Sequence, residues 1–194
     1  RRRRERRITA RAASGLLSRF DRDWTHRVRV PVSRGGLLAA AGVLAAHQRG
    51  DSLARFRQAV AWLQERLQND PTNRAHQLWL AQAYLGLGEW KSAEHWFVVV
   101  DAKGPSRLLA RGQLATLAAR RGDWALAARR LGPGPSAGHV DGEYLVFEAR
   151  LAALRGDPDE AIAKLSTALH VGVNNFHWVQ HEVRQDFAAL AKDG

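Results

Sequence analysis

Residues 77–105 read QLWLAQAYLGLGEWKSAEHWFVVVDAKGP, and this stretch decides the fold. Two short amphipathic runs lie on either side of a Gly-Glu-Trp turn at residues 88–90. Large and small apolar side chains recur about one helical turn apart: Leu80, Ala81 and Tyr84 before the turn, and Ala93, Phe97 and Val100 after it. This spacing predicts two helices that close on each other at their small residues, with Pro105 ending the unit.

The same pattern returns at intervals of thirty-four residues. Three classes of residue keep the interval: the turn glycines Gly88, Gly122 and Gly156, the alanines Ala93, Ala127 and Ala161, and the apolar residues Phe97, Leu131 and Leu165. An acidic residue follows each glycine. An ordinary helical bundle with chance periodicity is the alternative, but several residue classes in one phase favour a repeated unit.

A thirty-four-residue period with these residues resembles the tetratricopeptide repeat (TPR). The resemblance covers residues 36–173 and is closest in residues 74–107. It implies an all-α fold, a right-handed α-solenoid of TPR-like helix hairpins. The family pattern has Tyr where this chain has Ala118 and Ala152, so we expect those two hairpins to pack more closely. Such a fold is a scaffold, and it does not by itself identify a partner.

The chain divides into three parts on this reading. Residues 1–34 form a basic arm and an amphipathic helix, residues 35–173 the TPR-like array, and residues 174–194 a C-terminal capping segment. We expect the second helix of the first hairpin to be about one turn longer than its counterparts and to stop at Pro71. The Gly-Pro-Gly-Pro sequence at 132–135 should cut a later helix short and open a loop over residues 132–141.

Further local predictions concern the start of the last repeat helix and the positions of the aromatic residues. Asp157 followed by Pro158 predicts the beginning of the last repeat helix. Phe176, Trp178 and Phe187 are expected to cover the end of the last hairpin, as a similar stretch does in bacterial arrays of the family. We attribute the tryptophans in or beside the turns and second helices to packing within the hairpins: Trp62, Trp90, Trp96 and Trp124.

The positive charge of the chain is concentrated at its N-terminus. The net charge is +11, of which residues 1–30 hold +8. The basic arm begins with Arg1, Arg2, Arg3, Arg4, Arg6 and Arg7. Four interpretations remain open: a solvated terminus, a contact with nucleic-acid phosphates, a contact with anionic lipid, and the front of an import signal. Residues 8–29 then form an amphipathic helix that either caps the array or lies on a membrane surface or partner.

Composition excludes several other classes of protein. There is no Cys, so disulfides and thiolate metal sites are excluded, and no apolar run reaches the ~18 residues of a membrane span. Because there is also no Met, we expect further sequence upstream. His177 and His181 share a helical spacing that suits zinc, but Trp178 stands where a metalloprotease has Glu. We expect no metal, no cofactor, no small-molecule substrate and no catalytic residues.

We therefore predict a non-enzymatic interaction scaffold that binds a partner peptide or helix in a concave groove lined by the first helices of the hairpins. The residues assigned to this groove are Leu78, Trp79, Gln82, Gln113, Thr116, Arg120, Val146 and Arg150. Two alternatives remain: a cytoplasmic region of a membrane-bound protein that acts as an assembly scaffold, and a nucleic-acid-associated subunit that uses the basic arm. The expected compartment is the cytoplasm, at or away from a membrane, and organellar import stays open.

Overall fold

A computed structural model describes residues 52–101, 107–135, 140–173, 183 and 185–187 of the chain. Within these ranges the regular structure is entirely helical, with no strand. The helices are α3 (Ser52–Asn69), α4 (Arg74–Gly86), α5 (Trp90–Asp101), α6 (Arg107–Arg120), α7 (Trp124–Leu131), α8 (Gly142–Arg155) and α9 (Pro158–Val171). The chain separates into two compact units, and the border between them falls inside α6, between Leu117 and Ala118.

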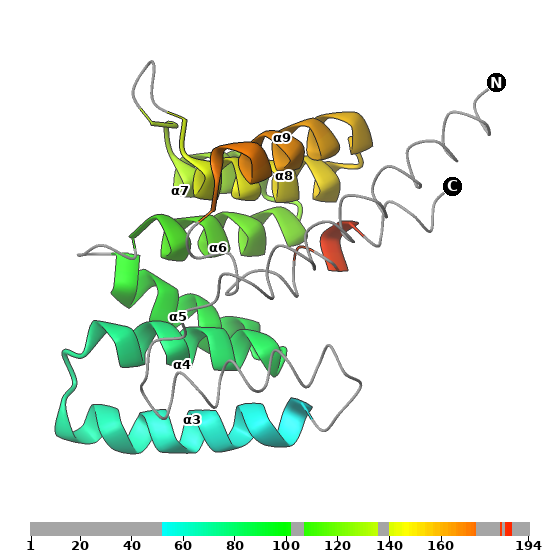
Figure 1. Ribbon diagram of the computed structural model, residues 1–194. Coiled ribbons are helices and arrows are strands. Elements are labelled where there is room, and N and C mark those ends of the chain that lie inside the picture. Colours follow the sequence, from blue (N-terminus) through cyan, green and yellow to red (C-terminus); the bar gives the residue numbers. More distant parts are fainter. Residues whose placement is uncertain (1–51, 102–106, 136–139, 174–182, 184, 188–194) are drawn as a thin grey trace. The chain divides into compact units, whose positions relative to one another are not determined.

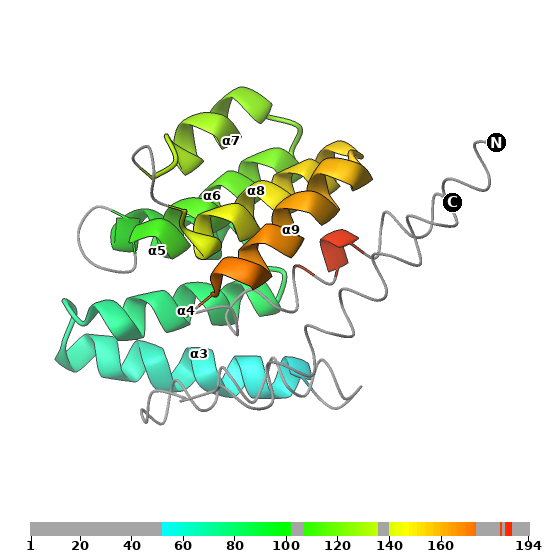
Figure 2. The same ribbon diagram turned by 45° about the horizontal axis from the view of Figure 1, so that its top comes forward.

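The first unit is built on α3, α4 and α5. Figure 2 shows α3 beside α4, and Figure 1 shows α4 beside α5. The inner face of α3 carries four buried apolar side chains at helical spacing: Phe56, Ala59, Leu63 and Leu67. Helix α3 ends at Asn69, ahead of Pro71, and is 18 residues long against 12 for α5. The predicted extra turn and stop are therefore confirmed.

The second unit contains the end of α6 and helices α7, α8 and α9. Helix α8 packs along α9, as Figures 1 and 2 both show. Helix α7 has only eight residues because Gly132, at φ 69°, leaves the helical region directly after Leu131. Ala118, Ala119 and Ala127 form a buried cluster where α7 meets α6, and Leu151 and Leu154 of α8 pack against it. The shortened helix is thus confirmed.

Three turns between helices have the same backbone geometry. Gly88, Gly122 and Gly156 all adopt a left-handed conformation, with φ of 75°, 78° and 82°. In each turn the glycine N–H donates to the carbonyl three residues earlier, and the next N–H donates to the carbonyl five residues earlier. An L side chain is strained at such a φ, whereas glycine is not. The thirty-four-residue spacing of glycines in the sequence therefore corresponds to a repeated backbone turn.

Acidic side chains start the helices that follow the second and third turns. The carboxylate of Asp123 accepts a hydrogen bond from the N–H of Leu126 at 2.9 Å, and Asp157 does the same for Glu160 at 3.1 Å. These bonds satisfy backbone donors that a helix start leaves without partners. Pro158 occupies the first position of α9, where its missing N–H costs nothing. The predicted helix start at Asp157 is confirmed.

Most predicted core positions are buried, with one correction. The three phase-keeping alanines, Ala93, Ala127 and Ala161, are at most 1% exposed. Trp90 and Trp124, in contrast, are 45% and 39% exposed, so the prediction that they pack within the hairpins is wrong. Both are the first residue of their helix, directly after a turn, and from this position they leave much of the indole in solvent.

Several predictions fall on residues outside the described ranges: the basic arm and the amphipathic helix of residues 1–34, Pro105, Phe176, His177, Trp178 and His181. Of the closing segment, the structure describes Val183, Gln185, Asp186 and Phe187 as helical. Val183 and Phe187 are buried.

Candidate functional site

The eight residues predicted to bind a partner lie on α4, α6 and α8, the helices that precede the three glycine turns. Seven of them are buried: Leu78, Trp79, Gln82, Gln113, Thr116, Val146 and Arg150. The eighth, Arg120, keeps 23% of its side chain exposed. The structure places these positions in covered environments rather than on an open surface.

Helix α4 is buried around most of its circumference, because residues 77–83 are all buried. Its polar side chains are only partly satisfied. Gln77 donates from Nε2 to the carbonyl of Pro71 at 2.6 Å, whereas the Nε2 of Gln82 has no hydrogen-bond partner. A buried amide group without a partner costs about 1–3 kcal/mol. The face of α4 that carries Leu78 and Gln82 is therefore apolar apart from one unused donor.

The predicted residues of α6 fall on either side of the border between the units. Thr116, in the first unit, is buried, and its hydroxyl donates to the carbonyl of Gly112 one turn earlier at 2.9 Å. This bond satisfies the hydroxyl within its own helix. Arg120 belongs to the second unit, where its guanidinium takes part in a different and longer-range contact.

In the second unit, Asp186 joins two of the predicted site residues. Arg120 donates from Nη2 to one carboxylate oxygen at 2.8 Å, and Arg150 donates from Nε to the other, also at 2.8 Å. The side chains of Arg150 and Asp186 are only 1% and 2% exposed. Each carboxylate oxygen is thus held by a guanidinium from a different helix, the geometry of strong charge-assisted hydrogen bonds.

Because this arrangement is buried, the two arginines strongly favour a negatively charged group at the position of Asp186. Removing two ions from water costs several kcal/mol each, and their attraction offsets this cost only when the hydrogen bonds are well made. The guanidinium of Arg150 also lies 5.7 Å from the ring centroid of Phe147, one turn earlier on α8. The backbone of α8 and the aromatic ring therefore hold Arg150 in position for the carboxylate.

The sequence interpretation singled out Arg120 and Arg150 but missed Asp186, which it treated only as part of a closing motif. A local signal was present: Val183, Asp186 and Phe187 are spaced i, i+3 and i+4, so they share one helix face. All three are buried, whereas Gln185 between them is exposed. An acid on an otherwise apolar face indicates that a cation lies opposite.

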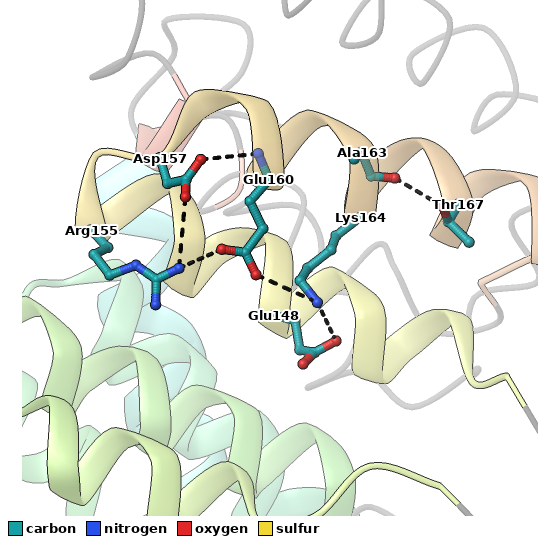
Figure 3. Close-up of polar contacts among 7 residues, drawn as sticks. All are labelled: Glu148, Arg155, Asp157, Glu160, Ala163, Lys164 and Thr167. Atoms are coloured by element: carbon teal, nitrogen blue, oxygen red, sulfur yellow. Dashed lines mark hydrogen bonds and ion pairs between the residues drawn. The ribbon is translucent and has the colours of Figure 1, made fainter. Parts of the chain in front are cut away.

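A second feature of this unit is a surface cavity of about 210 Å³ between α7, α8 and α9. Its lining includes the apolar residues Ala128, Leu131, Leu151 and Ala152 and several charged side chains, whose ion pairs Figure 3 shows. Lys164 contacts Glu148 at 3.0 Å and Glu160 at 3.6 Å, and Arg155 pairs with Glu160. Because each of these charges is already paired within the network, the cavity offers no group that points to a particular ligand.

The ion pairs change the protonation behaviour of Lys164. Burial disfavours its charged form, but the hydrogen bond to Glu148 and the charges of Glu148 and Glu160 outweigh this effect and raise the pKa of Lys164. In the first unit, partial burial and the nearby charge of Glu89 raise the pKa of Tyr84. Neither shift brings a group into the physiological range, so neither marks an acid–base site.

The described residues contain no group of three or more His, Asp or Glu side chains that could hold a metal ion. Over those same residues, every helix is too short or too polar to cross a bilayer. Comparisons of the chain with protein-family models, with curated proteins and with solved structures find no match. The candidate site therefore rests on the geometry of Arg120, Arg150 and Asp186 alone.

Proposed function

We propose that this chain is a non-enzymatic interaction scaffold, a right-handed solenoid of TPR-like helix hairpins that binds a partner peptide or helix along its first helices. One observation carries the proposal: the same left-handed glycine turn, with the same backbone hydrogen bonds, recurs at Gly88, Gly122 and Gly156. A regular interval between identical turns is typical of stacked repeats, which create extended binding faces. In this proposal the chain acts in the cytoplasm.

The chemistry of the first helices supports a partner that is mainly apolar. Leu78 and Trp79 of α4 and Val146 of α8 are apolar, and Thr116 has its hydroxyl satisfied internally. The charged exceptions are Arg120 and Arg150. An amphipathic helix laid on such a face would contribute apolar anchors at i, i+3, i+4 and i+7, with a carboxylate where it meets an arginine.

Burial of these positions decides how the proposal is tested. Replacing Leu78 or Arg150 with a residue of opposite character would disrupt the unit itself, so loss of binding would report only unfolding. Arg120 is the better choice, because 23% of its side chain is exposed and Asp186 keeps its contact with Arg150 when Arg120 is replaced. The stability of the Arg120 variant is measured beside its binding, since Arg120 also pairs with the buried Asp186. Arg129 on α7 is the matched control, since it is exposed and its replacement removes the same charge from a second helix.

A display library of helical peptides provides a search for ligands that assumes no known partner. We expect the selected peptides to bind the wild-type chain and to lose about tenfold or more in affinity on Arg120→Gln, while Arg129→Gln has little effect. Circular dichroism would verify that both variants keep their helical content. The proposal would be contradicted by peptides whose affinity is unchanged by Arg120→Gln but falls when Arg129 or Trp124 is replaced. Such peptides would place the binding face on the second helices.

The basic arm favours a second candidate function. Residues 1–30 hold +8 of the net charge of +11, which suits a contact with nucleic-acid phosphates or with the anionic surface beside a membrane-bound assembly. Deleting residues 1–7 should abolish a purely electrostatic interaction with RNA, and that interaction should weaken steeply with salt. Phe20 and Trp24 lie on the apolar side of the amphipathic helix predicted over residues 8–29. Binding to anionic vesicles that requires these two residues as well as charge would instead favour the membrane surface.

A further inference from the structure

The helical turn that carries Asp186 is held in the second unit by one face. Val183, Asp186 and Phe187 point the same way by their spacing, and each is at most 3% exposed. Gln185, on the other side of the turn, is exposed. The side chains buried on this face are therefore an acidic residue, an apolar residue directly after it, and another apolar residue three positions before it.

The two arginines make this recognition specific for a carboxylate. Arg120 and Arg150 each donate to a different oxygen of Asp186, both at 2.8 Å. An isosteric amide has one oxygen and one NH₂ group, so one arginine would face a donor instead of an acceptor. A side chain of the same shape without the second oxygen would leave a buried cation poorly paired, and a poorly paired buried cation strongly destabilises the structure that contains it.

We infer that the face marked by Arg120 and Arg150 is a binding site for a partner helix with this apolar–x–x–acid–apolar pattern. The chain's own residues Val183, Asp186 and Phe187 are its resident occupant, which the partner helix replaces. The inference rests on the proposed function, because it treats the unit as a receptor for a helix. It goes further by naming the chemistry of the ligand and by placing a competitor within the same chain.

The two arginines differ in exposure. Arg150 is almost fully buried, but Arg120 keeps 23% of its side chain exposed, so in this inference an incoming carboxylate reaches Arg120 first. The buried ion pairs select the ligand by charge more than they add net stability. Because the resident turn and the site belong to one chain, a partner must compete with a turn whose effective concentration is on the order of millimolar. The wild-type chain should therefore bind such a helix weakly, and a weaker occupant should strengthen binding.

The test uses the full chain and a fluorescent peptide that copies residues 176–191. In the chain, Asp186→Asn weakens the resident turn, and Gln185→Lys is the matched control because it raises the net charge by the same amount at an exposed position of that turn. We expect the peptide to bind the Asp186→Asn chain about tenfold or more tightly than the wild type or the Gln185→Lys chain. A peptide with Asn in place of its Asp should not bind. Equal, weak binding to all three folded chains would overturn the inference.

A second measurement covers the case in which Asp186→Asn fails to fold. In the ¹⁵N-labelled wild-type chain, excess unlabelled peptide should accelerate hydrogen exchange of the amides at 183–187, because the peptide displaces the turn. Unchanged exchange at high peptide concentration would show that the turn is a fixed structural part, and the inference would fall. The wild-type chain could also turn out to be a dimer that Asp186→Asn converts to a monomer. That result would assign the site to a second copy of the chain and would also overturn the inference.

These outcomes separate the inference from the proposed function. If the peptide replaces the turn but display yields no ligand that depends on Arg120, the proposed function fails and the exchangeable occupant remains. If selected ligands depend on Arg120 but bind the wild-type and Asp186→Asn chains equally, the scaffold function stands and only the inference fails.

Discussion

Asp186 and Arg150 are 36 residues apart in the chain and meet at 2.8 Å in an almost fully buried ion pair. We expect Arg150→Met to lower the free energy of unfolding by about 3–5 kcal/mol, because it leaves the buried carboxylate with Arg120 alone. The double variant Arg150→Met/Asp186→Leu should lose less than the single variant, since it leaves no buried anion. Urea denaturation of both single variants and the double variant completes the cycle. Strictly additive losses would show that the two side chains do not interact.

The repeated turns give a prediction that depends on backbone conformation alone. Gly156 has φ 82°, and a Cβ added there would meet no atom within 4 Å apart from those of its chain neighbours. Gly156→Ala should therefore cost about 1–2 kcal/mol through strain. Gly156→Asn should cost less, because asparagine tolerates the left-handed region better than alanine does. Equal stability of all three proteins in urea would mean that the turn is not left-handed in solution.

How much of this fold the sequence predicts depends on how local each feature is. The spacing of Gly88, Gly122 and Gly156 and the acid after each glycine predict the turns, because the backbone conformation and the caps are decided within five residues. The Gly-Pro pattern after Leu131 likewise predicts the short α7. The exposure of Trp90 and Trp124 was not predicted, because a periodic pattern does not tell how much of a first-turn side chain the rest of the fold covers.

The candidate site was less predictable because its decisive contact is long-range. Arg120 and Asp186 are 66 residues apart, and no local pattern pairs them. The sequence placed Arg120 and Arg150 on one predicted face, but it gave no reason to expect an acid of the closing segment between them. Only the folded unit brings the three charges together.

Close packing at the repeat contacts gives a third prediction. Ala127 is 1% exposed and packs with Ala118 and Ala119. Ala127→Leu adds three carbon atoms at this contact and should cost roughly 1–3 kcal/mol through overpacking. Ala125→Leu is the control, because Ala125 lies on the exposed side of the same helix. If both variants melted at the wild-type temperature, the helix register in this unit would be wrong.

The ion pairs around the surface cavity should matter much less than the buried ones. Lys164 and Glu148 are both about a quarter exposed, at 26% and 28%, and such pairs contribute about 0–1 kcal/mol. Lys164→Met should therefore change stability near neutral pH only slightly. A loss comparable to that of Arg150→Met, measured in the same urea series, would contradict the distinction between the two networks.

The raised pKa of Lys164 predicts the direction of its pH dependence. The folded chain holds this proton more tightly than the unfolded chain, so the stabilisation is present below the unfolded pKa of ~10.4 and is lost as the pH rises through the folded value. The stability difference between wild type and Lys164→Met should shrink above about pH 10. Urea titrations on either side of this pH would measure it, and a difference that grows with pH would contradict the assignment.

The central claim is that the first helices of the repeats form the binding face. The most direct test is the hydrogen-exchange footprint of a display-selected helical peptide on the full chain. We expect the bound peptide to change exchange in the first helices α4, α6 and α8, with the largest changes around Arg120 and Arg150, and to leave α5, α7 and α9 unchanged. Changes confined to α5, α7 and α9 would contradict the account.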